Sequence, residues 1–175
     1  MTLRILDIAS DQRTPEQERI FEKLTQGRGR ILTPYRVWIH SPAVAAPMEQ
    51  LGTFLNKRSS LSPREVEIAI LIVAAHWRAD YVLHAHMKAG RAAGLDETTI
   101  DKLRSGELAH FQEPHERSVY GFVNAMVQGR KLSDSQFADY EAELRREGIA
   151  ELLAMIGYYT SVSLAMNVHD VHPEQ

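Results

Sequence analysis

The sequence predicts an all-α fold, and three observations support this prediction. Nearly every segment repeats its apolar residues with the period of a helix, and no stretch shows the polar–apolar alternation of a half-buried strand. Thr14 and Ser62, each followed by proline, are typical helix starts. A chain of 175 residues with 44% hydrophobic side chains can bury a core of its own. We therefore expect a single-domain helical bundle over residues 1–175, with its core at about residues 62–93.

Local signals place the helices in order along the chain. The first helix begins after Thr14 with proline and acidic residues in its first turn, and it ends before Gly27. Pro34 and Pro42 interrupt the following segment, so we expect loop and short helix there. The other boundaries follow from apolar periodicity and from Gly or Pro breaks. The expected helices cover about residues 15–26, 44–57, 62–75, 81–93, 96–104, 113–128, 133–147 and 149–168.

The clearest helix start lies in the middle of the chain. Ser62 and Glu65 have the spacing of a capping box, in which each side chain bonds the backbone of the other. Val66–Ala75 is apolar around the whole helix except for Glu67, which predicts a helix buried on all sides. Asp80 is expected to cap the next helix after a tight turn, so the two helices should pack antiparallel.

Composition excludes several classes of protein. A net charge of -3 and a pI near 6.2 argue against a nucleic-acid partner, which would require a basic face. The absence of cysteine excludes disulfides, thiolate metal sites and thiol redox chemistry. The first residues lack the apolar core of a signal peptide, and the longest apolar run, Ile68–Ala75, is too short to span a membrane. We expect a cytoplasmic protein without a membrane partner.

His84 and His86 invite a metal-site interpretation, which helical geometry disfavours. Residues two apart on a helix point about 200° apart, so these two side chains cannot hold one ion together. No further ligands are evident near them in the sequence. We therefore expect no metal at this position.

Glu67 and His86 are instead expected to form a pair. An ionised carboxylate inside a buried helix is costly unless it has a partner. His86 lies on an apolar stripe of its helix with Val82 and Ala89, so it faces inward. In the antiparallel hairpin the two side chains lie at similar depths, within reach of a hydrogen bond. Such a pair can act as an acid–base unit in catalysis. The alternative interpretation is a buried ion pair that has no catalytic role.

The segment "LSPREVEIAILIVAAHWRADYVLHAHMKAGRAAGL" resembles the core of the carboxymuconolactone decarboxylase and alkylhydroperoxidase D superfamily. There a Glu is followed twelve residues later by the first Cys of a C-x-x-C motif, and a His follows four residues after the second Cys. Glu67 and His86 match this pattern, whereas Ala79 and Val82 occupy the cysteine positions. Residues 81–86 resemble the Y-E-W-x-x-H motif of the decarboxylase-like branch, with Val82 in place of its Glu.

The resemblance covers about residues 15–170, including the flanking "PYRVWIHSP" and "GYYTSVSLAMN". It implies the alkylhydroperoxidase D-like helical fold. Because this sequence lacks the cysteines of the family site, only the residues that transfer protons, Glu67 and His86, remain of it. We expect cofactor-free decarboxylation or isomerisation of a small carboxylated lactone or keto acid, with His86 as general acid and Glu67 orienting it. The alternative is a member of the fold that binds a small molecule or partner without chemistry, which the apolar Val82 favours.

Five further residues are candidates for binding an anionic organic substrate: Tyr81, Val82, His84, Arg36 and Asn167. Tyr81 and His84 are neighbours of the proposed pair at the start of the same helix, where backbone N–H groups can also meet an anion. Arg36 suits bidentate recognition of a carboxylate, although a salt bridge within the protein is an equal alternative. Asn167 lies in an apolar helix and must satisfy its amide.

The last expected helix, residues 149–168, is apolar around much of its circumference. One small core does not readily cover so much apolar surface, so we expect a homo-oligomer. The resemblance also implies dimers, trimers or hexamers. Tyr158 and Tyr159 in this helix are expected to serve packing.

Overall fold

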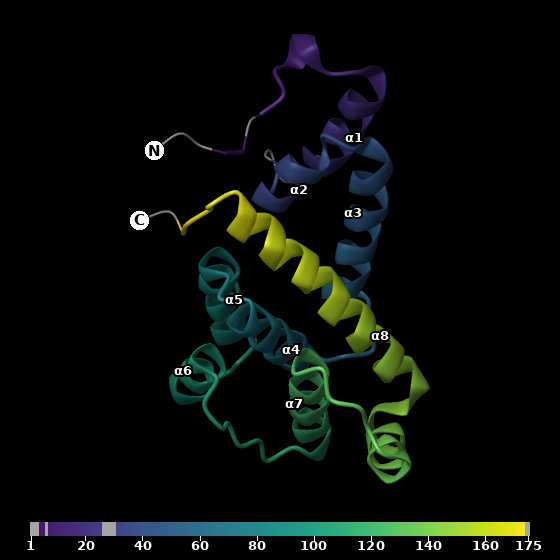
Figure 1. The fold of residues 1–175 in the computed structure, drawn as a ribbon, viewed down its shortest axis with the longest axis vertical. Coiled ribbons are helices and arrows are strands. Elements are labelled where there is room, and N and C mark those ends of the chain that lie inside the picture. The colour runs from purple at the N-terminus through teal and green to yellow at the C-terminus, as the bar shows by residue number, and fades with distance from the viewer. Residues whose placement is uncertain (1–3, 6, 26–30, 174–175) are drawn as a thin grey trace.

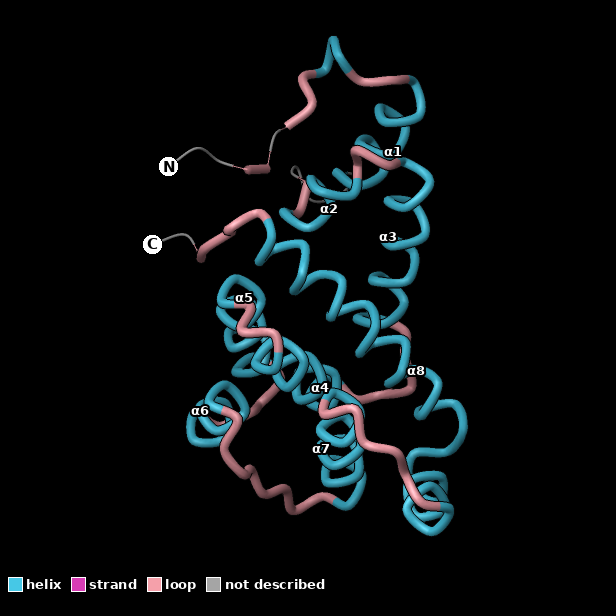
Figure 2. Tube along the Cα trace, viewed as in Figure 1, coloured by secondary structure: helices cyan, strands magenta, loops and turns pink. Residues whose placement is uncertain are grey.

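The structure is a computed structural model, and it describes residues 4–5, 7–25 and 31–173. This part of the chain is helical and contains no strand, which confirms the expected all-α fold (Figure 2). A short 3-10 helix, η1, precedes eight α-helices. Their bounds are η1 Ser10–Gln12, α1 Pro15–Thr25, α2 Thr33–Trp38, α3 Pro42–Lys57, α4 Pro63–His76, α5 Asp80–Ala92, α6 Glu97–Ser105, α7 Pro114–Val127 and α8 Asp134–Val168.

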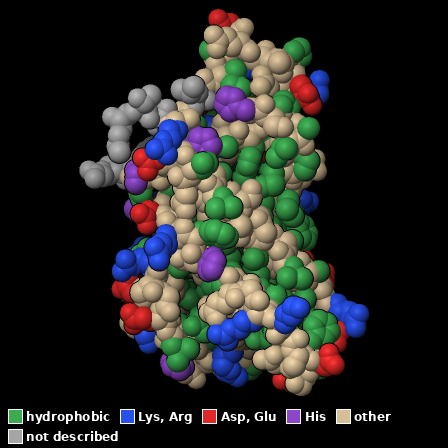
Figure 3. All heavy atoms as spheres, viewed as in Figure 1, with side chains coloured by type: hydrophobic (Ala, Val, Ile, Leu, Met, Phe, Trp, Pro, Cys, Tyr) green, Lys and Arg blue, Asp and Glu red, His purple; other side chains and the backbone are tan. Residues whose placement is uncertain are grey.

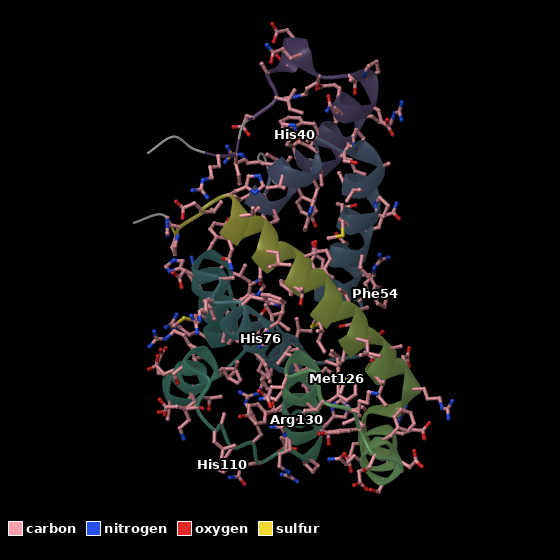
Figure 4. All side chains as sticks on the ribbon, viewed as in Figure 1. His40, Phe54, His76, His110, Met126 and Arg130 are labelled. Carbon is pink, nitrogen blue, oxygen red and sulfur yellow. The ribbon has the colours of Figure 1, made fainter. Side chains whose placement is uncertain are left out.

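Helix α8 runs diagonally through the molecule and separates two groups of helices (Figure 1). Helices α1–α3 lie on one side of it and α4–α7 on the other, and α8 contacts α2, α3, α4, α5 and α7. Figure 4 shows the same division, with Phe54 of α3 and His76 of α4 on opposite sides of α8. The candidate site lies where the two groups meet along α8.

Helix α4 is the centre of the larger group and is buried along most of its length. Ser62 and Glu65 form the expected capping box, with each side chain accepting a hydrogen bond from the backbone N–H of the other. From Glu65 to Ala74 every residue is buried, as the apolar circumference of this segment predicts. The helix packs against α5, α6, α7 and α8, so its side chains have fixed surroundings on all sides.

The turn between α4 and α5 differs from the sequence-based expectation. Asp80 is the first residue of α5 and does not cap it; the N-cap is Ala79, which makes no side-chain hydrogen bond. The chain reverses through Arg78, whose φ of 50° lies in the left-handed region. This reversal leaves Asp80 in the first helical turn, where its charge favours the positive end of the helix dipole.

The two helices expected near the C-terminus form one element, α8, with a break inside it. Arg145 has φ 57° and ψ 167°, which is not helical, so the break lies slightly before the expected position at about residue 148. By length and composition alone α8 could span a membrane, but half of its most apolar stretch is buried within the fold, which is equally typical of a core helix.

Candidate functional site

The expected pair of Glu67 and His86 is present in the structure. Nδ1 of His86 lies 2.8 Å from Oε2 of Glu67, so the central helix α4 is joined to α5 by a side-chain hydrogen bond. The side chain of Glu67 is only 11% exposed and that of His86 only 18%. Because Nδ1 is engaged by the carboxylate, Nε2 is the ring nitrogen that remains for exchange of a proton with a ligand.

His86 forms part of the wall of a cavity of about 270 Å³. The cavity lies where α2, α3, α5 and α8 meet, so both helical groups contribute to it. Two of the predicted substrate-binding residues, Tyr81 and Val82, also line it. The hydroxyl of Tyr81 donates a hydrogen bond to Oγ1 of Thr33 at 2.9 Å, which ties α5 to α2 beside the cavity.

Three further tyrosines line this cavity besides Tyr81, and sequence reasoning did not place any of these three there. The hydroxyls of Tyr35 and Tyr158 lie 3.1 Å apart, and the hydroxyl of Tyr159 donates to Oδ1 of Asn56 at 2.9 Å. Burial raises the pKa of the Tyr158 and Tyr159 hydroxyls above the ordinary value of 10.0. Both phenols therefore stay protonated at neutral pH and remain hydrogen-bond donors.

Gly52 permits the close approach of two of these hydroxyls. A Cβ atom at this position would lie 2.9 Å from the hydroxyl oxygen of Tyr35 and closer still to the phenol of Tyr158. A glycine inside a helix costs about 1 kcal/mol relative to alanine, and here the tyrosines use the space that it leaves. Gly52 in the middle of α3 is the sequence signal that could have revealed this packing.

Three of the predicted substrate-binding residues lie outside the cavity. Arg36 is held by Asp7, with distances of 2.6 and 3.0 Å to its two carboxylate oxygens, so the alternative interpretation of an internal salt bridge is the correct one. His84 is exposed and faces a different hollow beside Arg104, because two residues along a helix place it on another face from His86. Asn167 donates to the carbonyl of Trp77 at 2.8 Å and so satisfies the end of α4.

A second Glu–His pair lies elsewhere on α4 and has a different setting. Nδ1 of His115 is 2.6 Å from Oε1 of Glu65, and the neighbouring Arg64 binds Glu116. These contacts join the first turns of α4 and α7. None of the four residues lines the cavity of His86, so we interpret them as a clamp between helices. Within the described ranges, no group of three or more His, Asp or Glu side chains is arranged to hold a metal ion.

Comparison with known proteins relates both the sequence and the fold to one family. The family model described as "Carboxymuconolactone decarboxylase family" matches residues 42–132, which include the whole segment from α3 to α7 and both members of the Glu67–His86 pair. A search of curated proteins found no match.

Several solved structures share the fold at low sequence identity. An uncharacterized peroxidase-related protein from Silicibacter sp. TM1040 aligns with a TM-score of 0.78 at 16% identity, covering 99% of this chain and 93% of its own. A protein of unknown function from Agrobacterium tumefaciens, proposed to be the antioxidant defence protein AhpD, gives 0.68 at 19% identity, covering 79% and 97%. A variant of the debrominase Bmp8 in complex with 2,3,4-tribromopyrrole gives 0.71 at 16% identity, covering 99% and 93%.

Proposed function

Because the chain belongs to the carboxymuconolactone decarboxylase family, we propose that it is a cofactor-free enzyme that decarboxylates or isomerises a small carboxylated lactone or keto acid. The observation that carries this proposal is the hydrogen bond between Glu67 and His86 in the wall of a cavity. A carboxylate that holds an imidazole fixes its tautomer and stabilises the imidazolium, so the pair is suited to general acid–base catalysis.

In the proposed decarboxylation the bond between the carboxylate carbon and the adjacent carbon breaks and CO₂ leaves. The electron pair of that bond passes to the neighbouring carbonyl and forms an enolate. Nε2–H of His86 then delivers a proton to the carbon, and the imidazole regains its proton from solvent. In the proposed isomerisation the same nitrogen first removes a proton from carbon and returns it elsewhere. Glu67 acts in both cases as the positioning residue that supports the charged imidazole.

The enolate that either reaction forms needs hydrogen-bond donors, because its oxygen carries the developing charge. Tyr35 and Tyr158 place two phenols in the cavity wall, and the raised pKa of Tyr158 keeps that phenol protonated. Gly52 lets them approach the backbone of α3 closely, so their positions are fixed by packing. Preorganised donors of this kind stabilise charge without a rearrangement during the reaction.

A thiol-dependent peroxidase activity is not part of the proposal. Hydroperoxide reduction of the alkylhydroperoxidase D type depends on a pair of cysteines, and this sequence contains none. Ala79 and Val82, which occupy the two cysteine positions, are buried and apolar. Turnover of hydroperoxides with thiol or dithiol reductants should stay at background.

The second candidate function is a small-molecule binder without catalysis. Val82 favours it, because the decarboxylase-like branch has an acid there and this chain presents an apolar wall to the cavity. Glu67 favours the enzyme, because a buried acid with no role is costly and easily replaced by evolution.

The test is a screen of carboxylated lactones and β-keto acids, read as CO₂ release and as deuterium incorporation from heavy water. His86→Gln should abolish the activity that the screen finds. His84→Gln is the matched control, because His84 lies on the same helix but is exposed and outside the cavity. Equal activity of the His86→Gln and wild-type proteins would refute the proposed mechanism, and binding without turnover across the screen would favour the second candidate.

A further inference from the structure

The polar side chains that line the cavity are largely committed to one another. Oγ1 of Thr53 donates to Glu49 at 2.9 Å, and the amide of Asn56 donates to the carbonyl of Gly52 at 2.8 Å. The other oxygen-bearing groups of the wall also have partners, as described above: Asn56 Oδ1 with Tyr159, Tyr81 with Thr33, and Tyr35 with Tyr158. A ligand therefore meets few polar atoms in this wall that the protein does not already use.

Besides the phenol that the proposed reaction recruits from the Tyr35–Tyr158 pair, two side chains of the wall differ from this pattern: His86 through its Nε2, and Lys57, which is exposed. Lys57 is the last residue of α3, and it is the one Lys or Arg among the described residues that line the cavity. Its side chain makes no hydrogen bond or ion pair within the described part of the chain. Two other cations near the N-terminal helices, by contrast, have acidic partners: Lys23 binds Glu49 at 3.0 Å and Arg36 binds Asp7.

The rest of the wall limits what can lie between these two groups. It is formed by aliphatic and aromatic carbon, including Leu32, Pro34, Val82 and Val162. An apolar cavity of about 150 Å³ is known to hold benzene, so about 270 Å³ leaves room for one ring with small substituents. The cavity therefore suits a flat, apolar ring with one charged end.

We propose that Lys57 is the specificity-determining cation of this site and that the ligand is a small cyclic monocarboxylate, whose carboxylate meets Lys57 and whose ring lies in the apolar cavity beside His86. The proposal rests on the proposed function for the use of this cavity, and it narrows the substrate class. It also replaces Arg36, which the salt bridge with Asp7 removes from consideration. An unpaired ammonium favours a carboxylate over a neutral isostere of equal size.

Benzoate and benzamide test the proposal, because they share a ring and nearly a shape but differ in charge. Ligand-observed NMR titration should show wild-type protein binding benzoate at least tenfold more tightly than benzamide, with an advantage that shrinks as salt is added. Lys57→Met should remove that advantage and leave benzamide binding unchanged, whereas Lys57→Arg should retain it. Lys88→Met is the matched control, because Lys88 is exposed on α5 and outside the cavity wall.

The outcomes separate this proposal from the proposed enzymatic function. Wild-type protein that prefers benzamide or binds neither compound would overturn the role of Lys57, as would a Lys57→Met protein that binds benzoate like wild type. The charge preference should persist in His86→Gln, because that substitution removes the proton donor and not the cation. Benzoate binding through Lys57 without turnover of any carboxylated lactone or keto acid would refute the proposed enzymatic function. It would still support Lys57 as the residue that selects a carboxylate.

Discussion

The ring of Tyr159 stands edge-on to the ring of His86, with 5.1 Å between the ring centroids and an interplanar angle of 87°. This contact fixes the imidazole from the side of α8, while Glu67 fixes it from α4. His86 lies on α5 and is therefore held by contacts from two other helices, α4 and α8. The orientation of the imidazole depends on both contacts, and each contact can be removed separately by substitution.

Tyr159→Phe should preserve the edge contact and remove the hydrogen bond to Asn56. We expect a loss of about 1 kcal/mol of unfolding free energy with most activity retained, because the ring still orients His86. Tyr159→Ala should cost about 3–5 kcal/mol and reduce turnover strongly. Urea denaturation and the turnover number measure the two effects, and equal turnover in both variants would show that the aromatic contact does not position the imidazole.

Gly52→Ala should destabilise the protein and disturb the cavity. The added methyl group overlaps the phenol of Tyr158, so α3 or α8 must shift, at a cost of about 1–3 kcal/mol. Gly148→Ala is the control, because its methyl group would meet only Leu144 at 3.6 Å and alanine is the better helix former. Thermal unfolding should place the midpoint of Gly52→Ala below wild type and that of Gly148→Ala at or above it; the reverse order would contradict the role of Gly52.

Glu67 and His86 should behave as a unit in a double-mutant cycle. Glu67→Gln and His86→Gln should each abolish activity, and the double variant should be hardly worse than either single one. Stability should show the same coupling, because removing one partner of a charged buried pair typically costs about 3–5 kcal/mol by leaving the other unpaired. Additive losses of unfolding free energy in the cycle would mean that the hydrogen bond contributes little.

A homo-oligomer remains a prediction, and the exposed face of α8 offers a specific test of it. Leu153 and Leu164 on this helix are 48% and 44% exposed, and hydrophobic side chains gather over α8 and α3 on the face seen in Figure 3. Light scattering should give a mass that is a multiple of 19.8 kDa. Leu153→Glu with Leu164→Glu should lower that mass, whereas Leu108→Glu, exposed in a loop, should not. A monomer at micromolar concentration would refute the prediction.

The parts of the fold and site that the sequence predicts are those that depend on local chemistry or on a simple requirement for a partner. The capping box of Ser62 and Glu65 is a short-range pattern. The pair of Glu67 and His86 follows because a buried acid needs a partner and the tight turn brings only one neighbouring helix to it.

The parts that the sequence does not predict join residues far apart in the chain. Arg36 meets Asp7 in the segment before α1, whose position no local pattern indicates. The contact of Tyr159 with Asn56 joins residues 103 positions apart, and that of Tyr158 with Tyr35 spans 123. Such contacts follow from how α2 and α3 pack against α8, which apolar periodicity alone does not determine.

The burial of α4 from Glu65 to Ala74 has a consequence for how activity is lost. Glu67 lies within a run of buried residues whose backbone amides have no route to solvent short of opening the core. Amide hydrogens of this helix should therefore exchange with solvent only through global unfolding, while those of exposed helix ends exchange by local fraying. We therefore expect Glu67 to lose its place beside His86 only when the core opens, so heating should end catalysis and cooperative structure in a single transition.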